Sequence, residues 1–281
     1  MPIAVAGILA ALFIVERVVP LRVARTRLVL RLVINVAVSG LAFLTSMMVV
    51  RPAALGALAW TSRESFGLVH VVPAPAWVQF LVGFALLDLG FYYWHVLNHK
   101  MPLLWRFHNV HHIDPDLDVS TGFRFHFGEV LMSTVFRVAQ VCLTGVSFAT
   151  FAVYELVFQA NTLFHHSNVR LPIRLERLLN MVLVTPRMHG VHHSQVRAET
   201  NSNFGVVFCW WDALHRTIRL NIAQSMIEIG VAGYSRPGDN RLSHALTLPF
   251  RKQRDYWRKE DGTVPERHAS ALAGSRTHLA E

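Results

Sequence analysis

Long apolar runs separated by short polar segments dominate the first two thirds of the chain. Residues 3–15 form a short apolar run that ends at Glu16, and a loop with five arginines follows it. Residues 32–50 are nineteen residues without a charge, long enough as a helix to cross a membrane. We therefore predict an uncleaved membrane segment at 3–15, lying partly in the interface, and a full span at 32–50.

The next apolar runs predict one more span and a hairpin. Residues 51–73 contain prolines, glycines and charged residues and predict a loop with a short buried piece at 53–60. Residues 75–94 predict a span that runs directly into His95. Residues 130–164 are mainly apolar, with Arg137, Gln140, Glu155 and Gln159 as the marked interruptions. Gly145 near their middle predicts two short helices that enter and leave on the same side. The fold class is all-α: an integral membrane helical bundle with a histidine-rich cytoplasmic helical cap.

Composition supports the membrane assignment. Hydrophobic residues make up 52% of the chain and charged residues 16%, whereas a soluble domain has about a quarter charged residues. The formal charge is +9, but the arginines flank apolar runs, which indicates positive-inside topology and contact with anionic lipid rather than nucleic acid. Cys142 and Cys209 have apolar neighbours and no metal-like or redox spacing, so no disulfide is expected.

We predict one membrane-embedded catalytic domain over residues 1–258 and a disordered tail over 259–281, which is polar and poor in bulky residues. Two aromatic-rich segments late in the domain, 203–205 and 210–212, are expected either to cover the candidate histidine site described below or to lie at the membrane interface.

Histidines provide the candidate chemistry. Eleven of the sixteen fall between residues 95 and 193, and eight of these follow helix-face spacing. Pro102 and the pair Thr185-Pro186 are typical helix starts in front of two of the clusters. Eight imidazoles exceed one tetrahedral site, which leaves two metals, or one metal with many helpers. The three clusters are His95-x3-His99, His108-x2-His111-His112 and His189-x2-His192-His193.

The predicted topology brings these clusters to one side. If the arginine loop is cytoplasmic, the span at 32–50 leaves the cytoplasm and the span at 75–94 returns. The hairpin keeps that parity, so all three clusters lie on the cytoplasmic face. The five remaining histidines are scattered, and we interpret them as ordinary structural residues: His70, His215, His244, His268 and His278.

Two carboxylates are further candidates. Asp88 lies inside a predicted span, where a carboxylate is costly, and shares one helix stripe with His95 and His99. We predict that it orients a metal-bound histidine from behind; the alternative is a capped or interface-paired aspartate. For Glu129, metal ligation or support of a ligand competes with the role of a helix N-terminal acid.

Seven motifs stand out along the chain. They are Asp88-x3-Tyr-Tyr-Trp-His95-x3-His99, Leu104-Trp-Arg-Phe-His108-x-Val-His-His112, Arg124-Phe-His126-x2-Glu129, Phe164-x-His166-x-Asn168, Thr185-Pro-x-Met-His189-x-Val-His-His193, Asn203-Phe-Gly205 and Trp211-Asp212. Taken together, these motifs resemble the fatty acid hydroxylase / sterol desaturase superfamily, and the resemblance extends from about Glu16 to Arg251. The chain departs from the family pattern at Val96, Phe127 and His165.

The resemblance implies a helical membrane protein that uses two non-haem iron ions and O2 to hydroxylate or desaturate a lipid. It implies Asp88, Glu129 and Asn203 as candidate catalytic residues, and it marks His126 as a recurrent family histidine. The ligands that it implies are His95, His99, His108, His111, His112, His189, His192 and His193, with His166 as a ninth.

The electrons for such a reaction have to come from outside the chain. The sequence contains no G-x-G-x-x-G, C-x-x-C or haem-attachment motif, so we predict a separate donor, a ferredoxin or a cytochrome b5-like protein, docking on the basic cytoplasmic face.

Two other functions stay open at this stage: a membrane zinc-dependent hydrolase with Glu129 as general base, and a non-enzymatic membrane metal-binding protein. A bis-histidine haem protein fits less well, because it needs one histidine from each of two facing spans. The lipid substrate is also open, and sterols, fatty acyl chains, alkylglycerols and carotenoid-like lipids all suit an apolar cavity.

Overall fold

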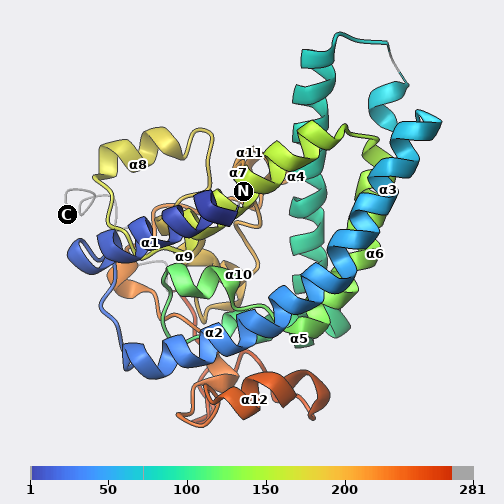
Figure 1. The fold of residues 1–281 in the computed structure, drawn as a ribbon. Helices are drawn as coiled ribbons and strands as arrows, with labels where there is room; N and C mark the ends of the chain where they lie inside the picture. Colours follow the sequence, from blue (N-terminus) through green and yellow to red (C-terminus); the bar gives the residue numbers. More distant parts are fainter. Residues whose placement is uncertain (1, 72, 268–281) are drawn as a thin grey trace.

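A computed structural model describes residues 2–71 and 73–267. Within those ranges the regular elements are helices, and extended pairing is limited to three isolated bridges, so the all-α prediction is confirmed. Figure 1 shows their arrangement. The α-helices are α1 (Pro2–Val18), α2 (Leu28–Thr45), α3 (Arg51–Glu64), α4 (Ala76–Lys100), α5 (Pro102–His112), α6 (Phe127–Thr144), α7 (Phe148–His166), α8 (Ile173–Leu179), α9 (Pro186–His192), α10 (Arg197–Thr200), α11 (Trp210–Leu214) and α12 (Leu242–Thr247).

Three helical segments of the described chain are long and apolar enough to cross a membrane: residues 28–70, α4 and α6. Only 22% to 33% of the most apolar window in each is buried, so most of these side chains face outward. Val36, Leu81 and Val135 are examples of large exposed apolar side chains on these segments. Lipid is the surrounding that such a surface favours, and the protein is a helical membrane bundle.

The prediction of a loop at 51–73 is wrong for most of its length. A single π-helical turn (Ser46–Val50) joins α2 directly to α3, which continues to Glu64. Pro52 lies in the first turn of α3, where a residue without a backbone N–H is tolerated. The proline therefore marks a local change in hydrogen bonding rather than the end of the helix. The buried piece expected at 53–60 lies inside α3, which ends at Ser65 in a left-handed conformation.

The two helices predicted on either side of Gly145 are confirmed as α6 and α7. Gly145 ends α6 with φ +68°, and the hydroxyl of Ser147 accepts a hydrogen bond from the Thr150 amide at the start of α7. A Cβ atom on Gly145 would lie 2.3 Å from the carbonyl oxygen of Phe66, so both the backbone angle and the close approach require glycine.

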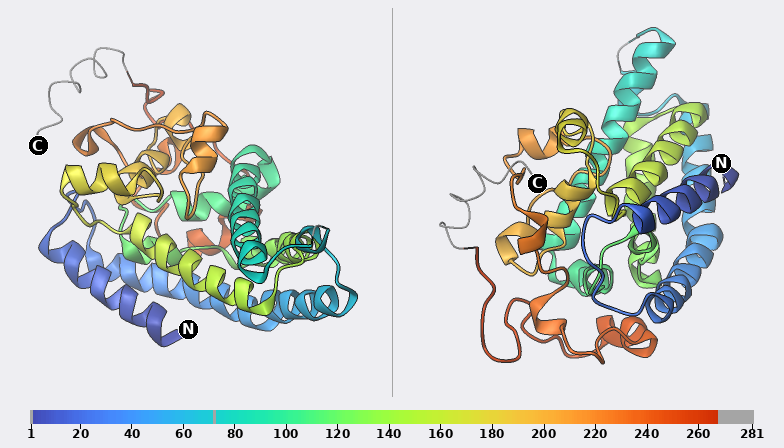
Figure 2. Two further views of the ribbon diagram at one scale, coloured as in Figure 1. Left: turned by 90° about the horizontal axis from the view of Figure 1, so that it is seen from above. Right: turned by 90° about the vertical axis from the view of Figure 1, so that its left-hand side faces the viewer.

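Short helices bring the histidine clusters together beside the C-terminal half of α4. Pro102 opens α5 one residue after α4 ends, and Pro186 opens α9 with Thr185 at the N-cap, so both predicted starts are confirmed. The Thr185 hydroxyl donates to the side chain of Asn180 rather than capping the helix. In Figures 1 and 2 the segments that follow α7 lie to one side of α4, while α1 packs along α7.

A buried ion network fixes α5 relative to the start of α2. Arg31 donates to Asp114 at 2.7 Å, to Asp118 at 2.6 Å and to Thr121 at 2.9 Å. Burial disfavours the charge of Asp118, but the hydrogen bonds and charge of Arg31 outweigh it and hold the pKa of Asp118 below its usual range. Because Asp114 follows α5 directly, the network anchors the end of the helix that carries the second histidine cluster.

The part of the predicted tail that the structure describes, residues 259–267, contacts the domain. Arg267 donates to both carboxylate oxygens of Glu199 at 2.8 Å, and Lys259 pairs with Glu228 at 2.7 Å. The rest of the predicted disordered tail, 268–281, lies outside the described residues. Cys142 and Cys209 are both free, as expected.

Candidate metal centre

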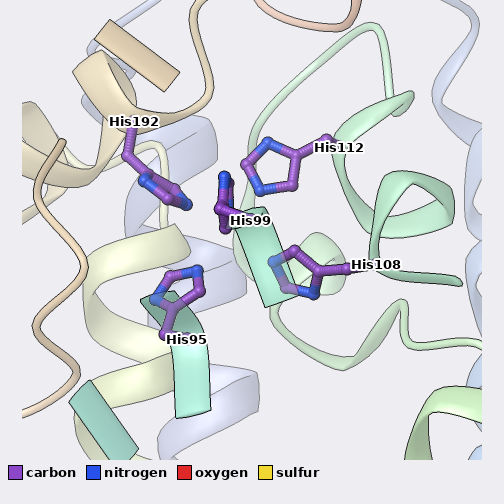
Figure 3. A group of neighbouring side chains, drawn as sticks. All are labelled: His95, His99, His108, His112 and His192. Atoms are coloured by element: carbon purple, nitrogen blue, oxygen red, sulfur yellow. The ribbon is translucent and has the colours of Figure 1, made fainter. Parts of the chain in front are cut away.

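Nine histidines converge in two adjacent groups, within each of which the candidate ligand nitrogens all lie within 4.8 Å of one another. These are the nine histidines singled out in the sequence. Figure 3 shows the first group, whose rings face a common space from α4, α5 and α9. The five-histidine group is His95, His99, His108, His112 and His192, and the four-histidine group is His111, His166, His189 and His193.

Helix geometry divides each H-x-x-H-H motif between the two groups. Residues four apart on a helix share a face, whereas a residue three apart lies about 60° to one side. In α5, His108 and His112 therefore join the five-histidine group and His111 joins the other.

The same spacing works in the opposite sense in the third cluster. His189 and His193 join the four-histidine group, and His192, between them in sequence, joins the five-histidine group. Histidines on α4 and α7 complete the two sets. Two copies of one motif thus serve two neighbouring sites.

Ring nitrogens of the four-histidine group already stand at ligand spacing. The Nε2 atom of His166 lies 3.0 Å from the Nε2 atoms of both His111 and His189, and those of His189 and His193 are 3.2 Å apart. An imidazole nitrogen binds a metal at about 2.0–2.1 Å, so two on one ion lie roughly 3 Å apart. Three of the six nitrogen pairs in this group therefore stand at the spacing that a shared metal ion requires.

Hydrogen bonds behind the rings fix which nitrogen faces inward. The Nδ1–H groups of His95, His166 and His192 donate to the backbone carbonyls of Phe204 (2.8 Å), Thr162 (2.8 Å) and Ser202 (2.7 Å). His108 donates in the same way to the carboxylate of Glu129, at 2.8 Å. Each bond leaves the Nε2 lone pair free for a metal and holds the ring in place.

Burial adds to this fit. In the five-histidine group, four of the five rings keep a buried nitrogen with no hydrogen-bond partner in the described part of the chain, and His95 is the fifth. An unpartnered buried polar atom costs about 1–3 kcal/mol, so a bound cation would offset several such costs.

Burial also keeps these imidazoles neutral, which is the form that binds metals. The pKa values of His111, His112, His189, His192 and His193 lie well below 6.5, because burial and then the neighbouring rings disfavour the charge.

The segment 203–208 closes over the five-histidine group. The ring of Phe204 packs against His95, His99 and His192, with centroids 5.7, 5.2 and 5.7 Å away. Residues 203–205 were expected either to cover the site or to lie at the membrane interface, and in the structure they cover the site. Asp212 holds it there by accepting hydrogen bonds from the backbone amides of Phe204 (2.8 Å) and Gly205 (2.7 Å).

The expectation that Asp88 orients a histidine ring is wrong. Its carboxylate accepts hydrogen bonds from the amides of Val207 and Phe208 and from the side chains of Tyr154 and Trp211. The chain folds back so that 207–211, rather than a histidine, lies opposite this point of α4. Asp88 positions the segment that covers the site.

Asn203 is also occupied by backbone partners. It adopts a left-handed conformation (φ +55°), donates to the carbonyls of Met188 and Arg219, and accepts from the Arg219 amide. It joins α9 to the segment that follows α11. Because its side-chain amide is used in this way, Asn203 positions α9 relative to the segment around Arg219.

Glu129 combines two of the arrangements considered for it. It lies in the first turn of α6 and accepts the Nδ1–H of His108. Its second carboxylate oxygen is buried and has no hydrogen-bond partner within residues 2–71 and 73–267.

His126 and His165 fall outside both groups. The Nδ1 atom of His126 accepts the Gly128 amide at the start of α6. His165 lies beside the four-histidine group and interacts with the Val206 carbonyl.

The supporting role of Asp212 was not assigned from sequence, although the Trp-Asp pair was part of the resemblance. The carbonyls of Thr162, Ser202 and Phe204 could not be assigned, because a backbone acceptor leaves no trace in residue identity.

Comparison with known proteins places these features in a family. The sequence model of a family described as Fatty acid hydroxylase matches residues 80–217, which contain all nine histidines. No solved structure matches the chain.

Three characterised relatives are lipid-modifying proteins by name. The chain is 33% identical over 203 residues to ornithine lipid hydroxylase OlsE of Rhizobium tropici, covering 72% of this chain and 60% of the relative. It is 28% identical over 161 residues to human alkylglycerol monooxygenase (56% and 34%). It is 30% identical over 152 residues to mouse cholesterol 25-hydroxylase (52% and 50%). The matches thus span between about a third and three fifths of these relatives' own lengths. From the family match and these relatives, the chain belongs to the fatty acid hydroxylase / sterol desaturase superfamily.

Proposed function

We propose that this protein is a membrane-bound non-haem diiron oxygenase that hydroxylates a lipid with O2 and external electrons. The observation that carries the proposal is the pair of adjacent all-imidazole groups at the end of an apolar helix. The names of the relatives favour hydroxylation over desaturation, because all three are hydroxylases or monooxygenases of lipids.

The donor set supports iron more than zinc. Imidazole binds both metals, but structural zinc usually has four ligands, often thiolates, and catalytic zinc three protein ligands. Here nine imidazoles surround two positions, and both cysteines lie outside the groups. Glu129 is engaged with His108, which weakens the alternative of a hydrolase that uses it as a free general base. Reductive activation of O2 for attack on an unreactive C–H bond is the chemistry that the metal pair would supply.

The chain itself would hold, orient and shield the site. Carbonyls and Glu129 keep the Nδ1 protons outside, while Phe204 limits the approach of water. His95 and His99 are half-buried on α4, whereas all members of the four-histidine group are buried. A lipid moving along the apolar surface of α4 would therefore reach the five-histidine group first.

Partners and membrane placement follow from the same proposal. We propose several membrane crossings, with the site on the cytoplasmic side next to the arginine loop. The electron donor would be a separate ferredoxin or cytochrome b5-like protein, attracted by the +9 formal charge.

The test is the purified full chain, analysed for metals and assayed on membrane lipid extracts. We expect two iron ions per chain and lipid products with one added oxygen atom, formed only with both O2 and a reductant. Products lacking two hydrogens would indicate desaturation instead. Zinc in place of iron, with turnover independent of O2, would refute the oxygenase and support the hydrolase.

A further inference from the structure

A cavity of about 590 Å³ lies between the arginine loop and residues 115–118, 168–170 and 224–229. Part of its wall is apolar and belongs to a small buried cluster formed by Leu117, Ile227 and Ile229. The cavity is thus amphipathic, with charged groups facing apolar side chains.

Five arginines and two aspartates line the cavity, an excess of three positive charges. Most of these groups already have partners. Arg31 and Arg17 both pair with Asp118, at 2.6 and 3.0 Å. The carboxylate of Asp116 accepts the backbone amides of Arg25 and Thr26. Arg25 pairs with Glu228 at 3.5 Å. Among the described residues, the lining arginines without a salt bridge are therefore Arg22 and Arg170.

The side chain of Arg22 has only neutral hydrogen-bond partners among the described residues. Its Nη1 atom donates to the side chain of Gln224 and, at 3.4 Å, to the carbonyl of Pro186. Its Nε and Nη2 atoms are buried with no hydrogen-bond partner among the described residues. The nearby charge of Glu176 favours the charged guanidinium, but that carboxylate pairs with Arg187, so Arg22 forms no ion pair of its own among the described residues. A buried guanidinium without its own ion pair is costly, and a planar fork of N–H groups matches a phosphate or carboxylate.

The fold holds Arg22 in this position from two sides. Asn168 accepts the Arg22 amide at 2.9 Å and donates to its carbonyl at 2.8 Å. The guanidinium lies against α9 at Gly190, where a Cβ atom would be only 2.3 Å from Nη1. Glycine next to the ligand His189 thus makes room for the arginine.

We propose that this cavity binds an oxyanion, a phosphate or carboxylate group, which pairs with Arg22 while any apolar part of the ligand lies against Leu117, Ile227 and Ile229. Two sources offer this chemistry: the head group of an anionic lipid, or a free anion such as phosphate. The site goes beyond the proposed oxygenase reaction and is tested by binding alone.

The experiment is calorimetric titration of the purified full chain in phosphatidylcholine nanodiscs. The probes are inorganic phosphate, hexanoate and dihexanoyl phosphatidic acid. Phosphatidic acid that binds at least tenfold more tightly than phosphate would support a lipid head group. Equal affinities, or binding of phosphate or hexanoate alone, would support a free anion. Absence of binding by all three probes would overturn the proposal.

Variants assign any binding to Arg22. We expect Arg22→Gln to weaken binding at least tenfold, and Arg22→Lys, which keeps the charge without the fork, to weaken it less. Arg22→Lys also decides the matter if the glutamine variant does not fold. The control Arg63→Gln removes an exposed arginine paired with Glu64 on α3. Unchanged affinity in a folded Arg22→Gln variant, or an equal loss in Arg63→Gln, would refute the assignment.

Discussion

The two histidine groups are built from the same motif but are held in different ways. In the four-histidine group the Nε2 atoms of four rings approach within 3.0–3.2 Å in successive contacts, and one ring, His166, is anchored by a carbonyl. In the five-histidine group three rings, His95, His108 and His192, are anchored from behind.

This difference separates a closed site from an accessible one. The four-histidine group is buried throughout, whereas His95 and His99 are half-buried on the apolar helix α4. An accessible site depends on its outer hydrogen bonds to stay ordered, because close packing does not hold every ring. We expect variants of the outer partners to affect the five-histidine group selectively.

The largest effect should come from removing one ligand of either group. His192→Ala should release the metal of the five-histidine group, and His189→Ala that of the four-histidine group. Each should lower turnover by more than about 100-fold, since even loss of an outer partner costs 10–100-fold. Metal analysis should show half the iron in each variant, with membrane insertion intact. The exposed histidine His70 serves as the control, as His70→Ala. Normal activity in His192→Ala would refute the ligand assignment.

A smaller, one-sided effect is expected from Glu129→Gln. The substitution removes the anionic acceptor behind His108 and should weaken metal binding at the five-histidine group by about 10–100-fold. In a chelator titration, the metal of the five-histidine group should be released at a lower chelator concentration than in the wild type, and the metal of the four-histidine group at the same concentration. Glu64→Gln, at an exposed carboxylate paired with Arg63, is the control. Equal weakening of both metals would contradict the separation of the two groups.

Asp212→Asn should act on the same group more weakly. Asparagine keeps one acceptor for the two amides that Asp212 holds, so Phe204 should lose part of its fixation and His95 part of its anchor. Because hydrogen bonds to a charged group contribute about 1.5–3 kcal/mol, unfolding free energy should fall by roughly that amount. Denaturant titration measures this, with Asp239→Asn as a buried aspartate away from the site. A loss of unfolding free energy no larger than in that control would argue against the role of Asp212.

Much of the site was predictable because helix periodicity relates spacing to direction. Histidines three and four apart have fixed directions on a helix, and Pro102 and Pro186 mark where two of the helices begin. The turn at Gly145 was predictable for a similar reason, since an apolar stretch too long for one short helix contains a residue suited to a left-handed turn.

Other features depend on the tertiary fold and were not predictable. Asp88 was expected to face a histidine because they share a helix stripe, yet residues 207–211 return to that stripe from far along the chain. Likewise, Pro52 looked like a helix breaker because residue identity does not reveal the preceding π turn. Helix periodicity predicts on which side of a helix each residue lies, but it does not predict which distant segment contacts that side.

The smallest expected effect concerns His165, which is adjacent to His166, the ninth ligand that the resemblance implies. The ring of His165 packs 4.2 Å from that of His189, yet its Nδ1 atom lies 3.1 Å from the Val206 carbonyl, outside the ligand group. His166 instead brings its Nε2 atom to within 3.0 Å of those of His111 and His189. His165→Gln should therefore leave iron content nearly unchanged, while His166→Gln should lose the metal of the four-histidine group. The reverse result would make His165 the ninth ligand and would require the end of α7 to rotate when metal binds.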